Sequence, residues 1–69
     1  MIWTADKVKA DLPPVVCQVG RNRYATARLS GRHNPFATVT LAYEPSSDWH
    51  FSWEAVARSL NNATPLVVD

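Results

Sequence analysis

The sequence contains one cysteine, two glycines and no long apolar run, and each scarcity excludes a class of protein. Cys17 alone cannot form an intrachain disulfide or a cysteine-rich zinc site. Two glycines are too few for a glycine-rich phosphate-binding loop. No segment approaches the roughly 20 apolar residues that cross a bilayer, so we expect no membrane partner.

The N-terminal segment lacks the basic start and apolar core of a secretory signal, which predicts a cytoplasmic protein. With 46% hydrophobic and 19% charged residues, the composition is that of a folded chain and not of a disordered one. We expect a single small domain over residues 1–69. Such a domain buries only about 60% of the surface of its unfolded chain. Self-association into a homodimer would add stability, and we leave that option open.

Charge is distributed unevenly along the chain. Four arginines and no acidic residue lie between Leu12 and Tyr43. The remainder holds three basic residues against all six acidic ones, a net charge of −3, so the whole chain carries only +1. The basic middle of the chain therefore predicts a surface for an acidic partner, although strong nucleic-acid binders are usually more basic overall.

Local patterns predict two helices and three strands. Thr4 can cap a first helix that ends before Pro13, and Ser52 can cap a second helix that ends near Asn61 and Asn62. Between them, the runs 15–19, 23–30 and 36–43 are β-branched or alternate in polarity, with turn residues separating them. The short, β-prone tail could add an edge strand or pair with another copy of the chain. We predict an α+β fold in the order α-β-β-β-α: a three-stranded antiparallel meander sheet with two short helices on one face.

The period of two sorts the three runs onto two faces of the predicted sheet. One face is apolar, and we expect it to pack against the helices: Val15, Cys17, Val19, Ala25, Ala27, Leu29, Ala37, Val39, Leu41 and Tyr43. The other face is mostly polar and holds Gln18, Tyr24, Thr26, Arg28, Ser30, Phe36, Thr38 and Thr40. Antiparallel sheets with one buried face and one solvated face show this division.

The polar face and its flanking turns form the main candidate site. Arginine pairs with phosphates and stacks on bases, exposed aromatic rings stack on unpaired bases, and sheets can read DNA grooves. The competing interpretation is an ordinary solvated sheet surface. We predict a small non-enzymatic protein that binds nucleic acid through Arg21, Arg23, Tyr24, Arg28, Arg32, His33 and Phe36.

A protein–protein interaction module is the alternative function. Such an inhibitor or adaptor would occlude a larger protein and would use the same arginines on an acidic protein surface. Aromatic residues and arginine dominate protein interfaces, and this chain has several large aromatics for its size. Helix-capping contacts and helix packing account for Trp3, Phe51 and Trp53, which leaves Trp49 as the candidate interface residue.

The sequence gives little support to a catalytic role. Asp48 and His50 could share one side of an extended segment, as an oriented base requires, but no nucleophile is tied to them by spacing. Cys17 falls on the predicted core face, where thiols are inert. His33, His50 and Cys17 lack the spacing of metal ligands. We therefore expect no enzymatic activity and no cofactor.

Overall fold

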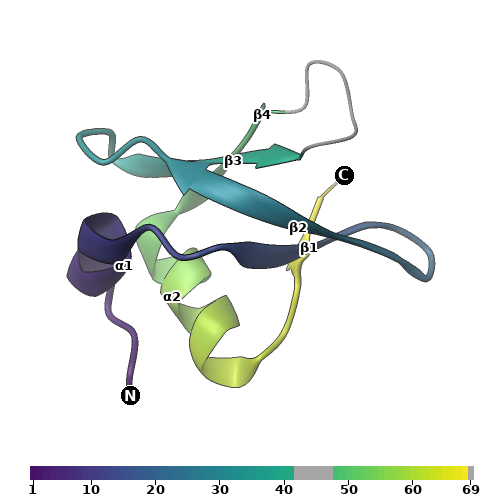
Figure 1. Cartoon of the computed structure of the whole chain (residues 1–69), viewed down its shortest axis with the longest axis horizontal. Helices are drawn as coiled ribbons and strands as arrows, with labels where there is room; N and C mark the ends of the chain where they lie inside the picture. The colour runs from purple at the N-terminus through teal and green to yellow at the C-terminus, as the bar shows by residue number, and fades with distance from the viewer. Residues whose placement is uncertain (42–47, 69) are drawn as a thin grey trace.

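The computed structural model describes residues 1–41 and 48–68 of the chain. It has an α+β architecture, in which two helices lie on one side of a curled five-stranded sheet (Figure 1). The strand order in the sheet is β4-β3-β2-β1-β5. Along the chain the elements are α1 (Ala5–Asp11), β1 (Val15–Gly20), β2 (Arg23–Ser30), β3 (Phe36–Leu41), β4 (Asp48–Ser52), α2 (Trp53–Asn62) and β5 (Leu66–Val67).

The predicted antiparallel meander forms the centre of this sheet, but the predicted number of strands is wrong. β1 pairs with β2, and β2 with β3, in antiparallel register. β4 adds to β3 in antiparallel register, and β5 pairs with β1 in parallel, so the sheet is mixed. β4 forms because alternation in the segment 48–52 directs Trp49 and Phe51 toward the core, where both pack. β5 forms because Leu66 is buried beside β1.

Both helices begin at the predicted caps. The Thr4 hydroxyl accepts a hydrogen bond from the backbone N–H of Lys7 at 3.2 Å, and the Ser52 hydroxyl accepts one from Ala55 at 3.1 Å. These bonds satisfy backbone donors that the first turn of a helix leaves unpaired. α1 ends at Asp11, where Leu12 turns into the left-handed region before Pro13. No helix in the described part of the chain is long and apolar enough to cross a membrane.

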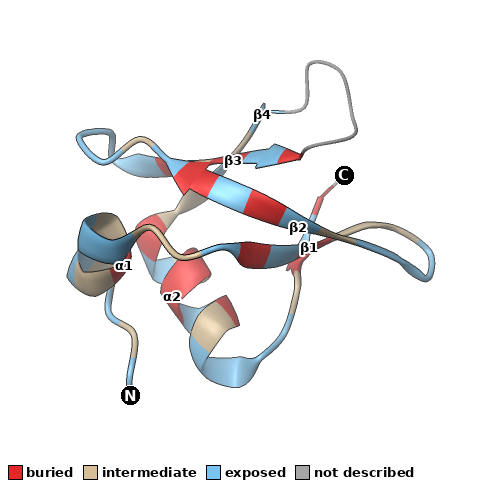
Figure 2. Ribbon diagram, in the orientation of Figure 1, coloured by how far each residue is buried: buried red, intermediate tan, exposed pale blue. Residues whose placement is uncertain are grey.

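The predicted division of the sheet into two faces is confirmed for the described residues. Buried and exposed residues alternate along β2 (Figure 2), and the buried ones join a single core cluster with residues of both helices. Tyr43, which was assigned to the apolar face, lies outside the described residues. Val8, Trp53 and Val56 are at most 1% exposed and form the helical side of the core. The helices therefore leave the opposite face of the sheet uncovered.

The turn between β2 and β3 is fastened to both helices. The indole Nε1 of Trp53 donates to the carbonyl of Asn34 at 2.8 Å. The guanidinium of Arg32 donates to the carbonyl of Ala10, near the end of α1, at 3.3 Å. Gly31 begins this turn at a φ of 88°, a conformation that glycine adopts without steric cost. This turn is therefore held in one position relative to the core.

Candidate nucleic-acid interface

The uncovered face of the sheet, which we call the open face, brings together side chains from all five strands. Residues paired across neighbouring strands project to the same side, so the strand register places them in rows. One row joins Tyr24, Gln18 and Val67, and another joins Ser30, Thr38 and His50. The open face comprises Val16, Gln18, Tyr24, Thr26, Arg28, Ser30, Phe36, Thr38, Thr40, Asp48, His50 and Val67.

Arg28 lies in the middle of this face and carries its central positive charge. It pairs with Thr40 on β3, which in turn pairs with Asp48 on β4. The Thr40 hydroxyl donates to the Asp48 carboxylate at 3.0 Å. Two strand spacings separate Arg28 from Asp48, roughly 10 Å, which is about one Debye length at 0.1 M salt. Arg28 has no hydrogen bond or ion pair with a described residue, so its guanidinium is available to a ligand.

Two aromatic side chains flank Arg28 on the open face. Tyr24 is 58% exposed and Phe36 is 49% exposed. Tyr24 lies four residues before Arg28 on β2, a separation of roughly 13 Å along the strand. Phe36 lies beyond the Ser30–Thr38 pair, at a similar distance on the other side of Arg28. The three predicted contacts therefore share one face but are spread along it, with roughly 26 Å between the two rings.

The two turns that were predicted to bind lie at opposite ends of β2. Arg21 is exposed at the tip of the β1–β2 hairpin, which projects beyond the helices (Figure 1), and Arg23 begins the next strand. Arg32 and His33 are exposed in the β2–β3 turn. Arg32 already contacts the end of α1, which ties one of the four arginines to the fold. The structure thus places Tyr24, Arg28 and Phe36 on the open face and the other four predicted residues at the two ends of β2. The seven residues do not line one pocket.

The open face also holds polar residues that were not predicted to bind. His50 is exposed beside Thr38, and the hydroxyls of Thr26, Ser30 and Thr40 lie in the neighbouring rows. The sequence placed His50 with Asp48 on one side of an extended segment, and both lie on the open face of β4. The alternation of polar and large apolar residues over 48–52 is a signal that could have placed it on this face, because a strand there must direct its apolar side chains to the core.

Both lysines of α1 are engaged within the helix layer. Lys7 forms an ion pair with Asp11 at 3.3 Å, and its ammonium lies 5.6 Å from the centre of the Trp3 ring. Lys9 lies 5.9 Å from the centre of the Trp53 ring. The charges of these two lysines are therefore met within the helix layer. The strands β1 to β4 with the β1–β2 and β2–β3 turns carry four arginines against Asp48 among the described residues.

Trp49, the candidate protein-interface residue, lies on the helix side of β4 opposite Val39. It is partly buried and packs against the core. Its indole Nε1 is buried and has no hydrogen-bond partner among the described residues. Core packing therefore accounts for much of the Trp49 side chain, and the aromatic rings that remain most exposed on the sheet are Tyr24 and Phe36.

Potential metal ligands and nucleophiles are not gathered in the described part of the chain. No group of three or more His, Cys, Asp or Glu side chains is placed to hold a metal ion there. Cys17 is fully buried, and this burial raises the pKa of its thiol, which disfavours the reactive thiolate. The chemistry that the open face offers is the binding of anions, rings and hydrogen-bonding groups.

Comparisons with protein-family models, with curated proteins and with solved structures return no match for this chain. The open face itself is consequently the basis for the function proposed below.

Proposed function

We propose that this protein is a small, non-enzymatic binding protein that holds single-stranded nucleic acid on the open face of its sheet. One observation carries the proposal: Arg28, without a carboxylate partner among the described residues, lies midway between two half-exposed aromatic rings, Tyr24 and Phe36. Binding of single strands combines a positive charge for the backbone with aromatic platforms for the bases. The hydroxyls of Thr26, Thr38 and Thr40 supply further hydrogen-bonding groups along the same path.

The width of the sheet favours a single strand over the groove of a duplex. The three intervals from β4 to β1 span about 14 Å before side chains are added. The major groove of B-DNA is about 12 Å wide and admits a helix or a two-stranded ribbon. The open face as a whole is too wide to enter it, so groove reading by the sheet, one option raised by the sequence, is not part of the proposal.

The spacing of the rings sets the length of strand that the face would hold. A stacked strand advances about 3.4 Å per nucleotide, so roughly 26 Å between the two rings corresponds to about seven or eight nucleotides. Site sizes of single-strand binders range from about 4 to 16 nucleotides. A 12-nucleotide strand is therefore a suitable probe.

A protein–protein interaction module is the second candidate. Val16, Tyr24 and Val67 are all exposed near one corner of the open face, at 49%, 58% and 61%, and an apolar patch beside arginine suits an acidic protein surface. In that case the protein would act as an inhibitor or adaptor.

A homodimer is a separate prediction, and light scattering by the purified protein at several concentrations tests it.

The test is binding of labelled 12-nucleotide DNA and RNA, single-stranded and duplex, across a salt series. Two or three arginine–phosphate contacts on a single strand predict a log–log salt slope of roughly −1.4 to −2.1. Arg28→Gln should weaken binding several-fold, whereas Arg58→Gln, the same charge change on the exposed side of α2, should leave it unchanged. Absence of binding at low salt, or equal effects of the two variants, would contradict the proposal.

A further inference from the structure

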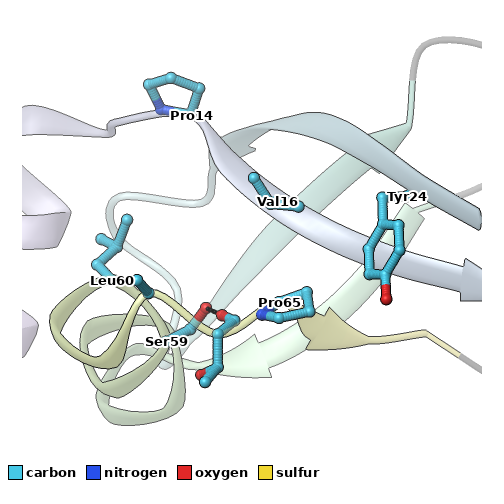
Figure 3. Close-up of a pocket in the computed structure, with 8 residues that line it drawn as sticks. Pro14, Val16, Tyr24, Ser59, Leu60 and Pro65 are labelled. Carbon is cyan, nitrogen blue, oxygen red and sulfur yellow. Dashed lines mark hydrogen bonds between the residues drawn. The ribbon is translucent and has the colours of Figure 1, made fainter. Parts of the chain in front are cut away.

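A crevice opens at the edge of β1, where β5 stops covering that strand. β5 pairs with β1 only at Cys17 and Gln18, so the edge at Val16 is left open. The crevice encloses about 340 Å³ between the start of β1, the end of α2 and the segment that leads into β5 (Figure 3). This volume lies within the range of small-ligand pockets, about 300–1,000 Å³.

The walls of the crevice are apolar, and one of them is an aromatic ring of the open face. Pro14, just before β1, and Val16 of β1 line one wall. Leu60 of α2 and Pro65, just before β5, line the other, and Tyr24 lies at the rim (Figure 3). Tyr24 is the only residue of the predicted interface among the described residues that line this crevice. The crevice therefore adjoins the surface that is proposed to bind nucleic acid.

The Ser59 hydroxyl and the backbone groups of Thr64, both residues of the crevice lining, are already satisfied within the chain. The Ser59 hydroxyl donates to the carbonyl of Thr64, and the N–H of Thr64 donates to the carbonyl of Ser59 at 3.1 Å. A ligand is therefore not needed to complete these bonds. The site offers an apolar slot with the phenol of Tyr24 beside it, which suits the flat face of a ring.

A second cavity places a positive charge next to this slot. It encloses about 450 Å³ and is lined by Leu12, Pro14, Arg28 and Leu29, so Pro14 forms a wall of both cavities. No carboxylate lines either cavity among the described residues. The apolar crevice and Arg28 thus lie on opposite sides of Pro14. Together they suit a ligand in which a flat ring is linked to an anion.

We infer that the crevice holds one unpaired nucleobase against Tyr24 while Arg28 contacts a phosphate of the same strand. The inference rests on the proposed function and adds to it a specific base-binding subsite. Unpaired bases are recognised when they leave the stack and pack on aromatic side chains. Tyr24 and Arg28 are roughly 13 Å apart along β2, and both side chains are long enough to shorten the gap between ring and guanidinium.

The first experiment separates the contribution of the bases to affinity from that of the backbone charge. Binding of a 12-nucleotide single strand is compared with that of an abasic strand of the same length and charge. Stacking on a protein ring contributes about 1–3 kcal/mol per base, which corresponds to a preference of at least about five-fold for the strand with bases. Equal affinity would overturn the crevice as a base site and would reduce the proposed function to contact with the phosphate backbone alone. No binding of either strand would overturn both.

The second experiment locates the base with a mononucleotide. Backbone amide resonances of Val16, Tyr24, Leu60 and Thr64 should shift on titration with a nucleoside monophosphate and stay in place with inorganic phosphate. Shifts confined to residues outside the crevice would contradict the inference. An acidic peptide with one aromatic residue serves as a third probe. Tighter binding of this peptide than of the 12-nucleotide strand would assign the crevice to a protein partner instead.

A pair of variants provides the matched control. Val16→Met places a longer, flexible apolar side chain at the wall of the crevice, and Ile2→Met introduces methionine at an exposed position before α1, outside both the crevice and the open face. Both positions are exposed, so neither change should disturb the fold, which circular dichroism checks. We expect Val16→Met to reduce the preference for the base-bearing strand at least two-fold, while Ile2→Met leaves it unchanged. Equal effects would overturn the placement of the base.

Discussion

Asn61 holds Trp3 by two hydrogen bonds across 58 positions of sequence. The backbone N–H of Trp3 donates to Asn61 Oδ1 at 2.7 Å, and Asn61 Nδ2 donates to the carbonyl of Trp3 at 2.8 Å. Trp3 directly precedes the cap of α1, and its ring lies under the ammonium of Lys7. One side chain of α2 therefore fixes the entry of the chain into α1.

Replacing Asn61 should therefore lower the free energy of unfolding more than replacing its neighbour Asn62 does. Asn61→Ala removes both hydrogen bonds, each of which contributes about 0.5–1.5 kcal/mol, reduced here by exposure to solvent. Asn62→Ala makes the same change in helix propensity at an exposed position with no side-chain hydrogen bond to a described residue. We expect Asn61→Ala to be less stable than Asn62→Ala by about 1–2 kcal/mol in urea unfolding. Equal stability would show that the pair contributes nothing in solution.

The two tryptophans of the core should respond differently to the same substitution. Trp53→Phe removes the bond to Asn34 and leaves a gap at a position that is 1% exposed, which should cost about 2–3 kcal/mol. Trp49→Phe removes an indole N–H that has no partner among the described residues, so no hydrogen bond is lost and we expect a cost under about 1 kcal/mol. Thermal and urea unfolding of both variants measure the difference. A larger cost at Trp49 would contradict the packing described above.

The two glycines provide a second matched pair. At Gly31 the φ is positive, and an added Cβ would lie 3.0 Å from the backbone oxygen of Phe36. Gly31→Ala should therefore cost about 1–3 kcal/mol. At Gly20 the nearest atom to an added Cβ is a flexible part of Arg23 at 3.5 Å, so Gly20→Ala should be neutral or slightly stabilising. Similar unfolding midpoints for the two variants would contradict this account of the β2–β3 turn.

Burial of Cys17 predicts a loss of stability at alkaline pH. Because burial raises the pKa of its thiol in the folded state, the unfolded state loses its proton first. The contribution of the buried, protonated thiol to the free energy of unfolding is fully present below the pKa of the unfolded state, about 8.5. It falls as the pH rises from there through the pKa of the folded state. Between pH 7 and 10 the wild type should lose more free energy of unfolding than Cys17→Ala. Parallel pH profiles for the two proteins would contradict a buried thiol.

Most of the fold could be predicted from local patterns in the sequence. Thr4 and Ser52 mark both helix starts because a capping hydroxyl acts on residues only three positions away. Alternation along β1, β2 and β3 was sufficient to separate the core face from the open face. β4 was missed as a strand of the sheet, and the tail that forms β5 was predicted only as an optional edge strand. Both are short, and what stabilises them is pairing with another strand of the sheet.

The candidate site was predictable in composition but not in arrangement. Alternation placed Tyr24, Arg28 and Phe36 on one face, yet only the register shows that they are spread along it. The bond from Arg32 to Ala10 depends on how α1 packs, which no local pattern encodes. The crevice beside Tyr24 likewise depends on where β5 leaves β1, a consequence of tertiary packing.

The central claim, that the open face binds single-stranded nucleic acid, is tested most directly by mapping amide shifts during titration with a 12-nucleotide strand. The account predicts that the largest shifts occur at Tyr24, Thr26, Arg28 and Thr38, with little change at exposed positions of α1 and on the outer side of α2. Shifts concentrated on the helices, or none at low salt, would contradict it.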